Sequence, residues 1–519
     1  MARGQISVMF LGTASGGGPS VTRNCSSLIC DFLGDYSLWL VDCAEGTLRQ
    51  FSNQPQQGFR YQPRKVNRIF VTHMHADHIM GIVPFLRGVL GIPEAGASPS
   101  YPVNPAPPRL EIYGPAGLRT FVRQNMKMTL TNTSETYAVH ELLFSTDPVT
   151  PCNPPPAAAE FDHNIGDQSV MHVSEAPGSD ILPGADGFWR VVARGPARAS
   201  RGCEVIVDAG PIQHRAPCLG YVFTETGPPN RRIVILGDTH DPSEIAPLCM
   251  DPPTSLLIHE ATDAPIPSHI DEGRISRRDP AEVQRKAILR GHSTPAMAGT
   301  FANTINAGSL VLNHFGGRFP APYDPKKTTD SRSMIMREIE RQATEAWGTR
   351  HPPAVAATDF LRVDIPVLGS AVFSGSGHGQ RVHSNANPPP SRPAPQGDVQ
   401  QEGAGPIPSG SGSRPVHDDQ TPSKGGTKGH TSLPSGPSTQ QHQHPPQATQ
   451  RPHQHVSNSA PPGPPKGSGH SGYHTNAGTQ STQQQPQQQK GPASPGRNSS
   501  TNSGPRKRQR RGGGSGGSS

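Results

Sequence analysis

Three histidines and one carboxylate occupy six consecutive positions, as His73, His75, Asp77 and His78. The run before them, residues 66–71, has the composition of a β-strand, and strand side chains alternate, so His73 and His75 project to one face. The loop that follows can fold Asp77 and His78 back toward the same point. Neutral imidazoles and a carboxylate are ligands suited to zinc or a neighbouring divalent ion. The stretch therefore predicts a metal site.

Residues of the same kind follow later strand-like runs. His214 lies in the strand predicted for residues 213–221, Asp238 follows residues 232–236, and His314 follows residues 310–313. Each of these histidines alone is more often an ordinary core or surface residue, so the prediction depends on the whole set. Seven nitrogen and oxygen donors exceed one tetrahedral zinc but fit two metal ions with one bridging carboxylate. Such a pair of ions suits phosphodiester hydrolysis at neutral pH.

Three further residues follow predicted strands or helices without an obvious metal partner. A histidine held by a carboxylate can protonate a departing alkoxide, which His292 and Glu260 could do together. The alternative for both is helix capping and hydrogen bonding at strand ends. Asp42 follows a buried strand, where a carboxylate often orients ligand histidines from behind. Its alternative is to cap the helix expected near Thr47.

A glycine-rich loop covers residues 12–20 and leads to Arg23 and Asn24. The loop lacks the Gly-Lys-Ser/Thr ending of a phosphate-binding P-loop, and a strand rather than a helix follows it. Arg23 and Asn24 could position an RNA phosphate or close the turn. The helix predicted for residues 117–128 carries Arg119, Arg123 and Lys127, which suits a solvated face or an RNA-facing surface.

The order of elements predicts an α/β fold. Strands are expected at residues 6–11, 26–30, 37–42, 66–71, 109–113, 203–207, 213–221, 232–236, 256–258, 310–313 and 354–363. Helices are expected at residues 79–90, 117–128, 280–289, 295–306 and 333–347. Many strands with helices between them imply two packed sheets flanked by helices.

Composition divides the chain of 519 residues into two parts. Residues 1–368 suit one large domain with its own core. Residues 369–519 are rich in Pro, Gly, Ser and Gln and cannot bury enough apolar surface to fold, which predicts a disordered tail. Residues 370–519 hold about 14 Lys and Arg against 4 Asp and Glu, so the formal charge of +7 resides in the tail. A basic surface on the domain must be local.

Seven scattered cysteines without a C-x-x-C pair favour free thiols in a reducing compartment. The N-terminus has no apolar secretory segment, and no stretch approaches the roughly 18–20 apolar residues of a membrane span. We therefore expect an intracellular protein outside the membrane. The basic cluster at residues 505–511 is of nuclear-localisation type, although it could equally bind RNA non-specifically, which leaves the cytoplasm as the alternative location.

The motif His73-x-His75-x-Asp77-His78 resembles the signature of the metallo-β-lactamase superfamily. Other segments, in order along residues 6 to about 320, resemble the tRNase Z family of tRNA 3′-processing endoribonucleases. These are residues 10–13, 19–27, 42–47, 237–239, 259–262 (His-Glu-Ala-Thr), 292–294 (His-Ser-Thr) and 312–315. The superfamily motif alone is shared by many hydrolases, and the two named segments make the match more specific.

The resemblance implies an αββα sandwich that binds two Zn²⁺, with Mn²⁺ or another divalent ion as an alternative. One ion would be held by His73, His75 and His214. The other would be held by Asp77, His78 and His314, with Asp238 bridging. The resemblance also implies Asp77 as general base, His292 as proton donor and precursor tRNA as substrate, cut after the discriminator base. It leaves a homodimer open.

The chain departs from the family pattern in two places. Val21 stands where the family's loop has a lysine that is tied to sensing a CCA end. Residues 214–238 leave room only for two strands and a turn, so the protruding arm with which single-domain relatives grip tRNA is missing. A small-molecule phosphodiesterase or other ester hydrolase of the same fold therefore remains an alternative. A non-catalytic RNA-binding scaffold is a third hypothesis, which the complete ligand set opposes.

Overall fold

The computed structural model describes residues 4–56, 59–94, 107–155, 166–198, 202–273, 277–324, 329–348, 351–367 and the strand at 372–374. In this part of the chain, ten strands form a first sheet in the order β17-β16-β1-β2-β3-β4-β5-β6-β7, with β8 beside β6. These strands are β1 (Ile6–Gly12), β2 (Ser27–Asp31), β3 (Leu38–Val41), β4 (Val66–Phe70), β5 (Leu110–Pro115), β6 (Tyr137–Leu142), β7 (Glu175–Ala176), β8 (Asp180–Ile181), β16 (Arg362–Ile365) and β17 (Val372–Ser374).

A second sheet has seven strands among the described residues, in the order β15-β14-β13-β12-β11-β10-β9. They are β9 (Trp189–Pro196), β10 (Glu204–Ile212), β11 (Cys218–Glu225), β12 (Arg232–Leu236), β13 (Thr254–Glu260), β14 (Leu310–Asn313) and β15 (Val355–Ala356). The helices are α1 (Thr47–Asn53), α2 (Ala76–Ile79), α3 (Ile82–Val89), α4 (Leu118–Met128), α5 (Ala246–Met250), α6 (Pro280–Leu289), α7 (Pro295–Thr304) and α8 (Ser331–Trp347), with short 3₁₀ turns at Pro63–Lys65 and Ser243–Ile245.

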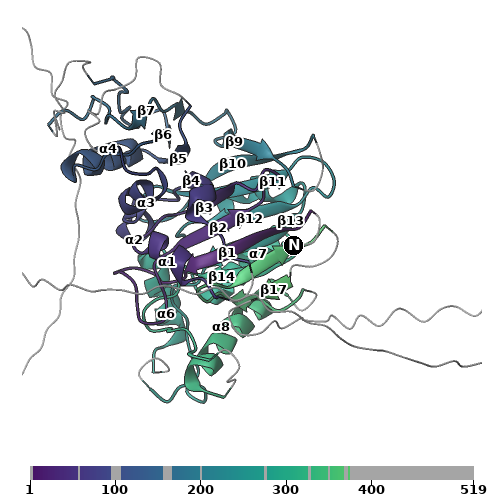
Figure 1. Cartoon of the computed structure of the whole chain (residues 1–519). Coiled ribbons are helices and arrows are strands. Elements are labelled where there is room, and N and C mark those ends of the chain that lie inside the picture. Colours follow the sequence, from purple (N-terminus) through teal and green to yellow (C-terminus); the bar gives the residue numbers. More distant parts are fainter. Residues whose placement is uncertain are drawn as a thin grey trace, which may run out of the picture. The chain divides into compact units, whose positions relative to one another are not determined.

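Strand alternation sorts the buried side chains into three layers. In β4, Phe70 faces the second sheet and Ile69 faces the helices that cover the first sheet. The Phe70 ring packs 5.3 Å from the ring of Tyr221 and 5.4 Å from that of Phe223, both on β11. Helices α1, α3 and α4 cover the outer face of the first sheet, while α5, α7 and α8 cover that of the second. Figure 1 shows α1 to α4 on one flank and α6 and α8 on another. The predicted αββα sandwich is confirmed.

The parallel parts of the two sheets place the candidate site residues. Strands β3, β4 and β5 are parallel, as are β12, β13 and β14. Polar residues follow the carboxyl ends of these strands, which is where open sheets place ligand sites. An isolated antiparallel bridge between His73 and Cys218 joins the end of β4 to the start of β11 in the other sheet. Residues from both sheets thereby meet at one edge.

Three predicted elements differ from the structure. The strand predicted for residues 213–221 begins only at Cys218, so His214 lies in the turn between β10 and β11. The predicted helix 79–90 is broken at Gly81, where a Cβ atom would lie 1.9 Å from the carbonyl oxygen of Ala44. The predicted strand 354–363 is two strands, because the chain crosses there from β15 in the second sheet to β16 in the first.

The basic residues of α4 face the interior. Arg119, Arg123 and Lys127 are buried. Their side chains donate to backbone carbonyl groups of the segment after β6, and Arg123 also pairs with Glu175 at 2.7 Å. Both the solvated and the RNA-facing interpretations of this helix are therefore wrong, because its charges bind residues 150–151 and 167–175.

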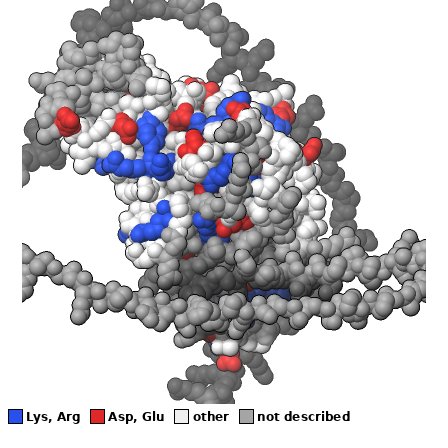
Figure 2. Space-filling model, turned by 45° about the vertical axis from the view of Figure 1, so that its right-hand side comes forward, with Lys and Arg blue, Asp and Glu red and all other residues white. Residues whose placement is uncertain are grey.

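The charged side chains on one face of the domain lie in small groups (Figure 2). On the face drawn in Figure 2, Lys and Arg side chains form separate groups with Asp and Glu among them. The seven cysteines all lie in the described ranges, and none of them forms a disulfide. No helix among the described residues is long and apolar enough to cross a membrane. Strand β17 continues the first sheet beyond residue 368, and the rest of the predicted tail lies outside the described residues.

The half-buried Glu340 on α8 makes the stability of this fold depend on pH. Glu340 Oε1 accepts a hydrogen bond of 2.9 Å from the backbone of Ala356 in β15. Burial raises the pKa of Glu340 to about 7. Because the folded pKa exceeds the unfolded one, this group stabilises the fold most below about pH 4.5 and progressively less up to about pH 7.

We predict that Glu340→Gln is more stable than the wild type above pH 7, by on the order of 1–3 kcal/mol, and close to it near pH 4.5. Urea denaturation at both pH values measures the difference. Glu345→Gln, at an exposed position of the same helix that pairs with Arg341, is the matched control. A constant difference between variant and wild type at the two pH values would contradict the prediction.

Candidate metal centre

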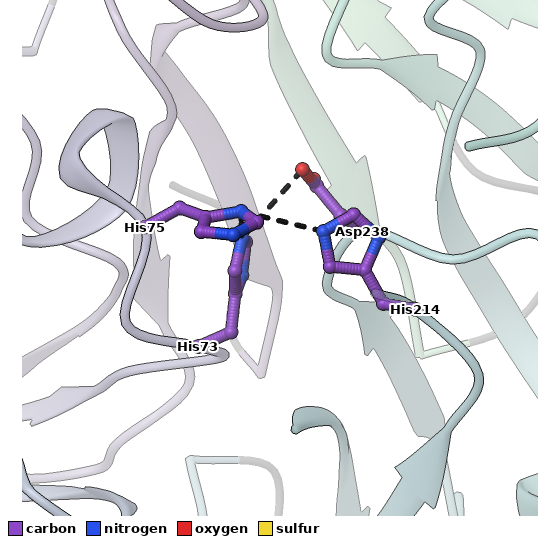
Figure 3. A group of neighbouring side chains, drawn as sticks. All are labelled: His73, His75, His214 and Asp238. Carbon is purple, nitrogen blue, oxygen red and sulfur yellow. Dashed lines mark hydrogen bonds and ion pairs between the residues drawn. The ribbon is translucent and has the colours of Figure 1, made fainter. Parts of the chain in front are cut away.

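A first group of donors consists of His73, His75, His214 and Asp238, and each offers one ligand atom within 4.8 Å of the others. His75 Nδ1 lies 2.9 Å from His73 Nε2 and 3.3 Å from His214 Nε2. Figure 3 shows the two histidines after β4 pointing from one side toward Asp238 and His214 on the other. The donors thus come from both sheets and converge on one point.

Hydrogen bonds on the far side of the rings orient two of these donors. His214 Nδ1 lies 2.6 Å from the carbonyl oxygen of Gly291. A carbonyl oxygen only accepts, so Nδ1 carries the proton and Nε2 presents a lone pair to the centre. His73 Nδ1 lies 3.1 Å from Thr72 Oγ1, which leaves its Nε2 toward the same point. Burial lowers the pKa of both imidazoles, which favours their neutral forms.

A second group consists of Asp77, His78 and His314. His78 Nε2 lies 3.2 Å from His314 Nε2, and Asp77 Oδ2 lies 3.3 Å from His314 Nε2. Behind His78, Asp42 Oδ2 accepts from Nδ1 at 2.7 Å, while Asp42 Oδ1 accepts from the backbone N–H of Thr72 at 2.8 Å. Asp42 therefore sits where its predicted orienting role requires.

Asp238 lies between the two groups. One carboxylate oxygen is 3.5 Å from His78 Nε2 and 3.3 Å from His314 Nδ1, and the other is 3.6 Å from His73 Nε2. Burial opposes its negative charge, but the surrounding histidines, His314 first, outweigh burial and hold the pKa of Asp238 well below its usual value. A carboxylate so placed can contact ligands of either group.

The donor set fits divalent metal ions. In the first group, neutral ring nitrogens face one another at 2.9–3.3 Å and bring lone pairs together, and a cation between them relieves that repulsion. The carboxylates supply negative charge, and hydrogen bonds hold the outer ring nitrogens as they commonly do for metal-binding histidines. The two groups are therefore compatible with a divalent metal.

His292 and Glu260 form a pair beside these groups. His292 Nδ1 lies 3.0 Å from Glu260 Oε1 and 3.7 Å from Asp238 Oδ2. Burial opposes the charge on His292, but its hydrogen bond with Glu260 outweighs burial and raises the pKa of the imidazole. Thr262 Oγ1 donates to Glu260 Oε2 at 2.6 Å and lies 3.0 Å from His314 Nδ1. Through Thr262, the pair of His292 and Glu260 is thus connected to His314, which is one of the candidate metal ligands.

The C-terminal end of α6 positions both His292 and the carbonyl group of Gly291, which accepts the hydrogen bond from His214. His292 N donates to the carbonyl of Ala287, and Gly291 N donates to that of Ile288. With Gly291 at a φ of +78°, this is a Schellman helix end. A Cβ atom on Gly291 would lie 2.5 Å from His214 Nδ1. One glycine therefore sets the positions of two histidines that are far apart in the sequence.

The residues predicted to bind substrate lie inside the fold. The Arg23 side chain is 3% exposed, and its guanidinium donates to Thr13 Oγ1 and to the carbonyls of Phe319 and Ala357. Asn24 is also buried, and its Nδ2 donates to the carbonyl of Glu45. These contacts close the turn after the glycine-rich loop, which is the alternative that the sequence left open.

Sequence reasoning missed the positioning roles of Thr262, Gly291 and Gly16. The Gly16 N–H donates to Asp77 Oδ2 at 2.5 Å, so the glycine-rich loop contacts the carboxylate of a candidate metal ligand. A glycine directly after a helical pattern signals a helix end. That signal could have identified Gly291, but its contact with His214 has no signature in the sequence.

We predict that Gly291→Ala weakens the binding of a divalent metal ion, with zinc as the probe, about 10- to 100-fold, because the new methyl group displaces His214 Nδ1 from its acceptor. Competition with a chelator measures the affinity. Gly117→Ala is the matched control, since Gly117 also has positive φ (+90°) but a Cβ atom there meets nothing within 4 Å. Equal zinc affinities for the two variants would contradict the assignment of Gly291.

Comparison with known proteins agrees with the family resemblance that the motifs indicate. No protein-family model matches the chain. Ribonuclease Z of Bacillus subtilis is 27% identical over 373 residues, which cover 70% of this chain and 99% of that protein. The human zinc phosphodiesterase ELAC protein 1 is 28% identical over 406 residues, which cover 70% and 99%. The crystal structure of human tRNase Z, short form, has 27% identity and a TM-score of 0.44 and covers 69% of this chain and 99% of that chain. The curated relatives confirm the resemblance of this chain to the tRNase Z family of the metallo-β-lactamase superfamily.

Proposed function

We propose that the chain is a zinc-dependent endoribonuclease that removes the 3′ trailer from precursor tRNA. One observation carries this proposal: two donor groups, each with residues from both sheets, meet around Asp238, directly beside the pair of His292 and Glu260. The names of the relatives support it, since they are a ribonuclease Z and a zinc phosphodiesterase. The same relatives support assignment of the chain to the metal-dependent phosphodiester hydrolases.

His73, His75 and His214 would hold one zinc ion, and Asp77, His78 and His314 the other, with Asp238 between them. When bound, two such ions acidify water and stabilise the charge that develops on a phosphoryl group in displacement. Mn²⁺ or another divalent ion could occupy the same donors.

Asp77 is the carboxylate best placed to take a proton from the attacking water. Its side chain is 12% exposed, whereas that of Asp238 is 3% exposed. The attack forms a bond from the water oxygen to phosphorus and breaks the bond from phosphorus to the 3′-oxygen. Asp77 would act as ligand and general base together.

His292 would give its proton to the departing 3′-oxygen. Nδ1 faces Glu260, so Nε2 is the ring nitrogen left for the substrate. Glu260 fixes the ring and stabilises its positive charge, which makes it a positioning residue for His292. The products are a 3′-hydroxyl on the tRNA and a 5′-phosphate on the trailer.

A second candidate function follows from the connection between β11 and β12. The strands are joined by residues 226–231, all of which are described, so no protruding arm lies between His214 and Asp238. A small-molecule phosphodiesterase, or another ester hydrolase of the same fold, would need no such arm. The scaffold hypothesis remains opposed by the complete donor set.

Three expectations remain proposals. Residues 1–368 would form the hydrolase domain, and residues 369–519 a tail whose cluster at 505–511 directs the protein to the nucleus or binds RNA. That cluster lies outside the described residues. A homodimer is likewise open.

We predict that the zinc-loaded protein cuts a trailer-bearing tRNA precursor to the products named above. His292→Ala should lower kcat by roughly 10²–10⁴, because it removes the proton donor, and Asp77→Ala should abolish activity. Gel analysis of end-labelled RNA measures both. His269→Ala, which changes an exposed histidine outside the donor groups, is the control.

The outcomes separate the three hypotheses. Hydrolysis of bis(p-nitrophenyl) phosphate without cleavage of the precursor would contradict tRNA processing and favour the small-molecule enzyme. Binding of the precursor, with neither reaction and without bound metal, would favour the scaffold.

A further inference from the structure

A pocket of about 190 Å³ adjoins the candidate proton donor. His292 forms part of its wall, together with Thr262, Asp263, Arg290, Gly317 and Arg318. None of the seven proposed metal ligands lines it. The pocket is therefore a compartment next to the metal-type residues rather than part of them.

A tight turn supplies one wall of the pocket with backbone donors. Phe319 N donates to the carbonyl of Gly316 at 2.9 Å, which closes a β-turn with Gly317 and Arg318 at its centre. Within the described part of the chain, the N–H groups of these two central residues have no hydrogen-bond partner. Gly317 is exposed, and a Cβ atom there would meet nothing within 4 Å. Two adjacent N–H donors in an open turn suit an anion.

Two arginines add positive charge. Arg290 is exposed and forms no ion pair with any described residue. Arg318 lies 3.4 Å from Asp263, but that carboxylate is already bound through both oxygens by Arg278 at 2.7 Å. Arg278 and Arg318 both contact this carboxylate, and Arg290 lines the same pocket, so Arg290, Arg318 and Asp263 together give the lining a net positive charge. Guanidinium groups pair well with phosphate oxygens.

We infer that this pocket is a phosphate-binding subsite, in which Arg290, Arg318 and the turn N–H groups hold the phosphate immediately 5′ to the scissile bond. The inference rests on the proposed function. If His292 protonates the departing 3′-oxygen, the nucleotide that keeps this oxygen lies on the His292 side of the centre. Its own 5′-phosphate then belongs beside His292, which is where the positive pocket lies.

The test compares Arg290→Ala with the wild type on two precursor RNAs. One carries only natural linkages, and the other has a neutral methylphosphonate at the linkage one nucleotide 5′ to the cut. We expect Arg290→Ala to lower kcat/KM for the natural RNA by roughly tenfold to a hundredfold. The methylphosphonate should lower wild-type kcat/KM similarly but should cost the variant much less, because the interacting charge is already gone.

Arg285→Ala is the matched control. Arg285 lies one turn earlier on α6, pairs with Glu282 and does not line the pocket, so its removal should leave the effect of the methylphosphonate unchanged. Arg290→Lys keeps the charge and should recover part of the loss. Thermal unfolding of each variant distinguishes a folding defect, which would lower activity on both RNAs by the same factor.

Bis(p-nitrophenyl) phosphate, which lacks a neighbouring phosphate, gives a further comparison. Arg290→Ala should lose much less activity on this diester than on RNA. Equal losses on the two substrates, or equal effects of the methylphosphonate on variant and wild type, would overturn the inference while wild-type RNA cleavage stands. Sensitivity to a methylphosphonate only 3′ to the cut would place the trailer in the pocket and would also overturn it. If the wild type cleaved no RNA, the proposed function would fail and the inference with it.

Discussion

The buried carboxylate of Asp238 depends on histidines from both halves of the fold. It lies 3.6 Å from His73 Nε2, at the end of the first sheet, and 3.3 Å from His314 Nδ1, at the end of the second. An isolated carboxylate is costly to bury, so its charge requires nearby partners. Those partners are in place only when the two sheets pack face to face through the aromatic cluster of Phe70, Tyr221 and Phe223. Packing between the sheets and assembly of the site are therefore one event.

Hydrogen bonds on the side away from the centre hold the donor rings in place. The orienting hydrogen bonds come from a strand end (Asp42), a helix end (Gly291) and a loop after β13 (Thr262). Each support is buried or partly buried and is tied to backbone, so the ring positions do not depend on mobile surface groups. The same supports leave the substrate side of His292 open toward a positive pocket. Fixed ring positions beside a pocket lined by Arg290 and Arg318 suit the proposed cleavage of a polyanion.

Local sequence patterns predicted much of this arrangement, and contacts between distant segments explain the remainder. The strands at 232–236 and 310–313 and the helix at 280–289 have their predicted bounds. Apolar runs specify the two strands, whereas Asp279, Pro280 and Gly291 mark the ends of the helix. The buried roles of Arg23 and Arg119 were not predictable in the same way, because their acceptors are carbonyl groups far along the chain. The position of His214 in a turn depends on its contact with Gly291, 77 residues later. The residue types predicted the chemistry of the site. Long-range packing determines which polar side chains lie in the candidate site and which are buried in the core.

Metal stoichiometry tests the central claim most directly, namely that both donor groups form one centre around Asp238. Elemental analysis of the wild-type protein, reconstituted with zinc and freed of loosely bound ions, should give two ions per chain. Asp238→Ala should retain one or fewer, because each group loses its shared carboxylate. A wild-type value of one ion or none would contradict the account, as would an Asp238→Ala protein that still binds two.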